Sequence, residues 1–166
     1  EILKDAVPKL ARVGLLRPSV ALDLPMKQLR AAALHLKLKL AEIETQADAK
    51  ELESAFKTAK QKQVGAIITT ATATFFAERK RIVELAIKYR LPAIYHQKEF
   101  VDEGGLMSYG TDNEDLYRKA AQYVDRILKG TKPADLPVQQ AMKIEFVINL
   151  KAAKQIGHTI PYELLW

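Results

Sequence analysis

Several residue types and patterns are missing from this chain of 166 residues. It contains no cysteine, which excludes disulfides, thiolate nucleophiles and cysteine-ligated metal sites. No run approaches the roughly 18 apolar residues that a membrane-spanning helix needs, so we expect no membrane insertion. The opening residues, EILKDAVPKL, carry acids and no apolar core, so we expect the leader to be absent from this chain.

Motifs for common catalytic chemistry are also missing. The sequence has no Gly-rich nucleotide loop, no P-loop and no GxSxG elbow around its serines, Ser19, Ser54 and Ser108. The three histidines do not share metal-ligand spacing and no Asp/Glu pair accompanies them, so we expect no metal site. These absences predict a non-catalytic protein with no cofactor and no catalytic residues.

The net charge of +6 is modest and does not mark a nucleic-acid surface. Lys and Arg are scattered over predicted helix faces, not gathered in a block or interleaved with aromatic residues. We therefore expect solvated helix faces and no nucleic-acid partner.

What the chain does have is a regular alternation of short apolar runs and segments with helical spacing. The runs predict strands at residues 12–16, 39–45, 64–69, 91–95, 106–109 and 143–148. The helical segments are residues 25–38, 48–62, 75–89, 113–128 and 150–156. Strand–helix repetition implies parallel strands joined by right-handed crossovers. We therefore predict one α/β lobe over residues 1–166. It should be doubly wound and flavodoxin-like, with a mainly parallel sheet of about five strands and helices on both faces.

Polar and aromatic residues gather in the loops that follow the predicted strands. In such a sheet these loops lie at one edge, where ligands bind. Thr70 and Thr72 could hold an anion or cap the next helix. Tyr95 could stack on a ligand or belong to the core. Asp112 could bind an amine or cap the following helix.

The order of several short motifs resembles a known family. These motifs are LPAIY at 91–95, EFV at 99–101, GGLMSYG at 104–110, ILKG at 127–130, KPADLP at 132–137 and FVINLK at 146–151. Together they are similar to the ABC-transporter substrate-binding proteins of the tryptophan/tyrosine-binding-like group, and the likeness runs on to residues 160–161. This resemblance implies one lobe of a type I periplasmic-binding-protein fold, in which two α/β lobes close on a solute about a hinge. The chain resembles only the C-terminal portion of such proteins.

The resemblance also implies a function and a set of ligand-binding residues. The function is binding of a small polar or aromatic organic solute, of the amino acid or carboxylate class, for delivery to an ABC transporter permease. The full-length protein would be periplasmic or extracellular and membrane-associated. By position in the family, the candidate ligand-binding residues are Pro18, Ser19, Thr70, Ala71, Thr72, Tyr95, His96, Tyr109 and Asp112.

Two further expectations concern assembly and an alternative role. Without a first lobe, the helix and linker of residues 113–137 need another surface for their apolar stripe. We expect them to pack away from the lobe or on a partner chain, which favours a homodimer. The alternative function is an effector-sensing or dimerisation module of a regulatory protein, because the fold is shared by both classes.

Overall fold

A computed structural model describes residues 1–19, 23–140 and 143–165. The strands are β1 (Arg12–Arg17), β2 (Lys39–Glu44), β3 (Ala66–Thr69), β4 (Ala93–Tyr95), β5 (Met107–Thr111) and β6 (Ile144–Ile148). The α-helices are α1 (Ile2–Ala6), α2 (Asp23–His35), α3 (Ala49–Gln61), α4 (Ala73–Ala77), α5 (Arg79–Lys88), α6 (Glu99–Asp102), α7 (Asn113–Leu128) and α8 (Leu150–Ile156). Two short 3₁₀ turns, Pro133–Asp135 and Tyr162–Leu164, complete the described structure.

The strands form one six-stranded sheet in the order β2-β1-β3-β4-β5-β6. The first five are parallel, and only β6 runs antiparallel, against β5. The doubly wound, mainly parallel α/β architecture is therefore confirmed, with one strand more than the expected five. The chain leaves β1 in one direction for β2 and in the other for β3, which makes the β1–β3 boundary the topological switch point.

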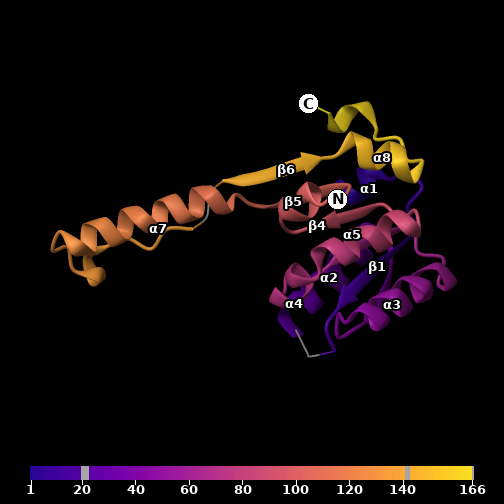
Figure 1. Cartoon of the computed structure of the whole chain (residues 1–166), viewed down its shortest axis with the longest axis horizontal. Coiled ribbons are helices and arrows are strands. Elements are labelled where there is room, and N and C mark those ends of the chain that lie inside the picture. Colours follow the sequence, from indigo (N-terminus) through magenta and orange to yellow (C-terminus); the bar gives the residue numbers. More distant parts are fainter. Residues whose placement is uncertain (20–22, 141–142, 166) are drawn as a thin grey trace.

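Two apolar cores lie on the two faces of the sheet. On one face, α3, α5 and α6 bury Phe56, Ile82 and Phe100. On the other face, α1 and α8 pack against the sheet, in the upper part of Figure 1. The central strands carry apolar side chains on both faces, which is what helices on both sides of a parallel sheet require.

Helix starts follow the caps visible in the sequence. Asp48 accepts a hydrogen bond from the Glu51 amide at 2.8 Å, and the Glu51 carboxylate accepts one from the Gln46 amide, a variant of the capping box. The predicted helix at 75–89 is, however, wrong as a single element. The structure divides it into α4 and α5 at Glu78, where Arg79 donates to the carbonyl of Phe76 at 3.2 Å.

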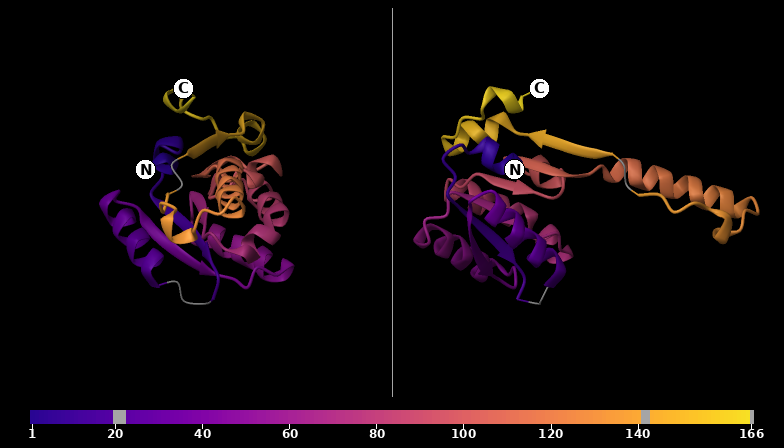
Figure 2. Two further views of the ribbon diagram at one scale, coloured as in Figure 1. Left: turned by 90° about the vertical axis from the view of Figure 1, so that its left-hand side faces the viewer. Right: turned by 180° about the vertical axis from the view of Figure 1, so that it is seen from behind.

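Helix α7 projects from the lobe as an arm, and the chain returns along it to β6 (Figures 1 and 2). We call residues 113–140 the arm. None of the 16 residues of α7 is buried, although its sequence is strongly amphipathic. Its apolar stripe faces the returning segment across an open groove of about 380 Å³, where Tyr123 donates a hydrogen bond to the Pro137 carbonyl. Val124 and Leu128 on α7, and Val138 on the returning segment, are largely in solvent.

Candidate functional site

A pocket of about 440 Å³ opens where β3, β4 and β5 end, beside the start of the arm. The loop after β3 contributes Ala71, Thr72 and Ala73 to its lining. Phe76 adds an aromatic side from α4. The remaining side chains come from the segment after β4 and from the beginning of α7, namely His96, Gln97, Glu99, Asn113 and Tyr117. Three separate strand ends therefore meet in one hollow, as the strand-end rule predicts.

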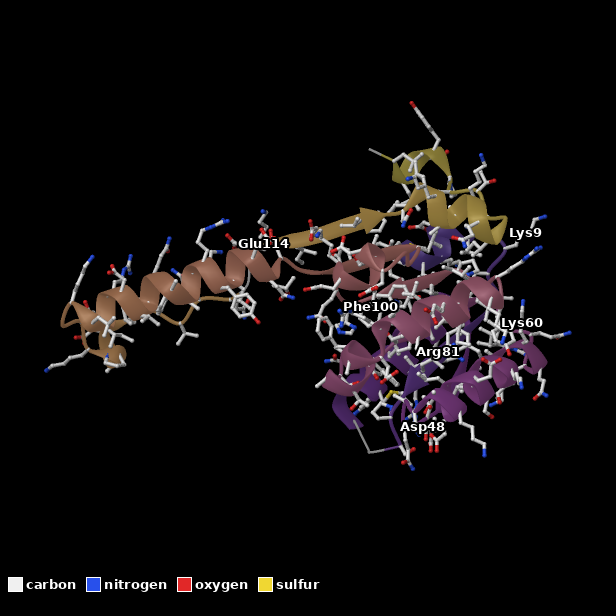
Figure 3. The ribbon with its side chains drawn as sticks, in the orientation of Figure 1. Lys9, Asp48, Lys60, Arg81, Phe100 and Glu114 are labelled. Atoms are coloured by element: carbon white, nitrogen blue, oxygen red, sulfur yellow. The ribbon has the colours of Figure 1, made fainter. Side chains whose placement is uncertain are left out.

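Phe100, from the short helix α6, is buried against the aromatic side of the pocket. Its ring is parallel to that of Tyr95, with centroids 4.6 Å apart. The rings of His96 and Phe76 meet it edge-on, at 5.4 Å and 6.4 Å. Figure 3 labels Phe100 on the side of the lobe next to the base of the arm, where Glu114 begins the exposed helix. This packing fixes the positions of the two rings that line the pocket.

His96 combines a ring in the aromatic cluster with an unused polar atom. Its Nδ1 is buried and has no hydrogen-bond partner among the residues that the structure describes. Burial holds the pKa of His96 below the usual value for histidine, against the opposing effects of Gln97 and Glu99. The imidazole is therefore neutral at pH 7, with one nitrogen that can donate and one that can accept.

The backbone of β5 comes unusually close to His96. A Cβ added at Gly110 would lie 2.0 Å from the carbonyl oxygen of His96. Only glycine allows this approach, so Gly110 lets the end of β4 lie directly beside β5, close to where the arm begins.

The threonines of the loop after β3 already have local hydrogen bonds. Thr72 caps α4, its hydroxyl accepting from the Phe75 amide at 3.3 Å. Thr70 is bonded to the carbonyl of Leu16 through both its amide, at 3.1 Å, and its hydroxyl, at 3.4 Å. Ala71 and Thr72 line the pocket, whereas Thr70 ties the loop to the end of β1.

Tyr95 and Tyr109 are placed very differently from each other. Tyr95 is only 2% exposed, and its hydroxyl has no partner within the described part of the chain. It belongs to the core, the second of the two roles considered from the sequence. Tyr109 is exposed and meets Phe146 across the β5–β6 ladder, with ring centroids 6.4 Å apart, so it does not line the pocket.

The Asp112 carboxylate makes two contacts at the point where the arm leaves the lobe. It caps α7 by accepting from the Asp115 amide at 3.0 Å, and it pairs with Lys143 at 2.7 Å. The bond from Lys143, reinforced by the Asp115 amide, holds the pKa of Asp112 below its usual range. The capping role considered from the sequence is the one that the structure shows.

Pro18 and Ser19 lie apart from the pocket, at the end of β1. Ser19 lines a different hollow, together with Glu42, Glu44 and Glu51. Pro18 accepts a hydrogen bond from Arg17 through its carbonyl, at 3.3 Å. Of the nine predicted site residues, the structure thus brings Ala71, Thr72 and His96 together around one pocket.

Six lining residues were not among the predicted site residues: Ala73, Phe76, Gln97, Glu99, Asn113 and Tyr117. Gln97 and Asn113 directly follow predicted residues in their loops, so the loop positions were sufficient to find them. Glu99 lies on α6, a four-residue helix with no recognisable periodicity, and Tyr117 is one turn inside α7. A group of His, Asp or Glu side chains suited to a metal is not found within residues 1–19, 23–140 and 143–165.

Solved structures share this fold. A protein from Vibrio cholerae superposes with a TM-score of 0.85 and is 26% identical, over 99% of this chain and 55% of that one. An ABC domain from Streptococcus pneumoniae, described in complex with L-Trp, superposes with a TM-score of 0.81 and is 26% identical, over 99% of this chain and 57% of that one. A ligand-free, open substrate-binding protein with adhesive properties from Clostridium difficile superposes with a TM-score of 0.73 and is 19% identical, over 98% of this chain and 55% of that one. At this identity it supports the fold alone. The chain thus spans little more than half the length of these relatives.

The sequence comparisons are consistent with the structural ones. Among curated proteins none matches the chain. The profile of the ABC transporter substrate-binding proteins matches residues 1–166, the whole chain. The chain therefore belongs to the ABC transporter substrate-binding protein family.

Proposed function

We propose that this chain is a ligand-binding lobe that holds a small polar or aromatic organic solute, of the amino acid or carboxylate class, for an ABC transporter permease. The observation that carries this proposal is the pocket at the ends of β3, β4 and β5. Aromatic rings and a few polar groups around a concave site are the usual composition of a small-molecule site. The family is a binding class, so the lobe acts by holding its solute and not by chemistry.

The size and lining of the pocket support an organic solute with a ring. Phe76, His96 and Tyr117 present aromatic surface, and Thr72, Gln97 and Asn113 present hydrogen-bonding groups. The Streptococcus pneumoniae relative is described with L-Trp, a ligand of this general kind. The family match also favours transport over the regulatory alternative.

The arm supports a two-lobed arrangement in a longer protein. Helix α7 extends beyond the sheet and buries none of its residues, although its stripe is apolar. The relatives are nearly twice as long as this chain, which leaves room for a second lobe in each of them. We propose that the arm packs on such a lobe and that the pocket closes against it.

The full-length protein would act in the periplasm or at the outer surface of the membrane. Within the described residues, no helix is long and apolar enough to cross a bilayer.

Calorimetric titration tests the binding role directly. Aromatic amino acids and short carboxylates would be titrated into the chain and into its Tyr117→Ala variant. Tyr117 is 73% exposed, so its removal should leave folding intact while it takes one aromatic wall from the pocket. Loss of one stacking wall should weaken binding by about tenfold.

Leu128→Ala is the matched control for this variant. Leu128 lies on the same helix and is 82% exposed, but it is far from the pocket lining. It should leave affinity unchanged. Equal affinity losses in both variants, or no binding by any member of the panel, would contradict the proposed function.

A further inference from the structure

Within the described part of the chain, the pocket lining contains one acidic side chain and no Lys or Arg. Glu99 is this acidic side chain, and it pairs with no Lys or Arg in the described residues. Three cations near the lining already have carboxylate partners. Lys98 pairs with Asp102 at 3.0 Å, Arg79 with Glu103 at 3.2 Å and Lys143 with Asp112 at 2.7 Å.

The aromatic groups that line the pocket also favour a cation over an anion. The rings of Phe76 and Tyr117 carry negative electrostatic potential on their faces, which attracts cations. Phe76 already shows this preference, because the Arg79 guanidinium lies 4.9 Å from its ring centroid. His96 is neutral at pH 7 and has one buried nitrogen without a partner, so it adds a polar contact and no positive charge.

We propose that this pocket receives a cationic end of the solute, an ammonium held by the Glu99 carboxylate between the rings of Phe76 and Tyr117. This inference rests on the proposed function, because it assigns a charge preference to the same pocket. A carboxylate in the same place would face Glu99 and find no free cation among the side chains that line this hollow. An acid group on the solute should therefore lie outside this pocket.

Glu99 also has a structural role that the test must separate from binding. It begins α6, where a carboxylate favours the positive end of the helix. Glu99→Gln removes the charge with almost no change in shape. Glu84→Gln is the matched control, because it removes one carboxylate from α5 that does not line the pocket, and its partner Arg81 keeps Glu53.

The experiment is an amide NMR titration of the ¹⁵N-labelled chain at pH 7 with two probes of similar size. Phenethylamine carries a ring and an ammonium, and 3-phenylpropionate carries the same ring and a carboxylate. We expect phenethylamine to shift the amides of Thr72, Gln97 and Asn113, with an affinity at least about fivefold higher than that of 3-phenylpropionate. Glu99→Gln should remove this preference, and Glu84→Gln should retain it.

Three other outcomes would overturn the inference, and each rejects a different part of it. Equal or tighter binding of 3-phenylpropionate at the same amides would reject the charge preference and leave the proposed solute site standing. A preference that survives Glu99→Gln would reject the role of Glu99. Failure of both probes to shift these amides would reject a cation site here, and the calorimetric panel would then decide separately whether the lobe binds any solute.

Discussion

At the scale of single residues, Tyr95 shows how a polar side chain can be kept in the core at a cost. Its ring packs flat on Phe100, but its hydroxyl is buried without a partner in the described structure. Burial raises the pKa of Tyr95, so the phenol stays protonated. A buried hydroxyl without a hydrogen bond costs about 1–3 kcal/mol of stability.

We therefore expect Tyr95→Phe to leave the free energy of unfolding unchanged or to raise it by up to about 1 kcal/mol. The ring contact with Phe100 is retained, and only the unpartnered hydroxyl is lost. Urea unfolding of the two proteins measures the difference. Solute affinity should not change, since Tyr95 does not line the pocket. A clear loss of affinity with intact folding would instead make its hydroxyl a ligand contact.

At the scale of elements, the root of the arm depends on Asp112. Its carboxylate caps α7 and pairs with Lys143, which directly precedes β6. Both interactions favour the ionised form and hold the pKa of Asp112 below its usual range. A lowered folded-state pKa contributes stability above the pKa of an unfolded aspartate. That contribution is lost as the pH falls through the lowered value.

We expect acid to loosen the first turn of α7 before it affects the sheet. The protection of the Asp115 and Leu116 amides from hydrogen exchange should fall in this acid range relative to that of amides of β1 and β3. Asp112→Asn keeps a capping oxygen and loses the charge, so the protection of these amides should be lower than in the parent and should not fall further in acid. Asp112→Ala loses both and should exchange fastest. Equal protection in all three proteins would show that the cap does not hold the arm.

The elements also show what sequence patterns can and cannot predict. The strands follow from short apolar runs, and the strand-end rule correctly brings the loops containing Thr72 and His96 together. The place of Tyr109 depends on the β5–β6 register, which sets it opposite Phe146, and no local pattern specifies that register. Glu99 reaches the pocket only because Phe100 anchors α6 against Tyr95, a contact between side chains that periodicity does not reveal.

At the scale of the whole molecule, the arm presents more apolar surface than a stable monomer usually leaves in water. On α7, Val124 is 55% exposed and Leu128 is 82% exposed, and the same helix borders the open groove beside the returning segment. In a two-lobed protein, the proposed second lobe would cover this surface. A chain that consists of these residues alone has one other apolar surface of the same kind available, which is the arm of a second copy.

We therefore expect the isolated chain to form a homodimer through its arms, and the dimer to dissociate when the stripe is made polar. Light scattering coupled to size exclusion, over a tenfold range of concentration, measures the mass. Val124→Glu with Leu128→Glu should give a monomer at every concentration, because two buried carboxylates would oppose the contact. Leu34→Glu is the control, since Leu34 is equally exposed but lies on α2, away from the arm. A parent chain that is monomeric throughout would exclude the dimer. A dimer that persists in the double variant would place the interface elsewhere.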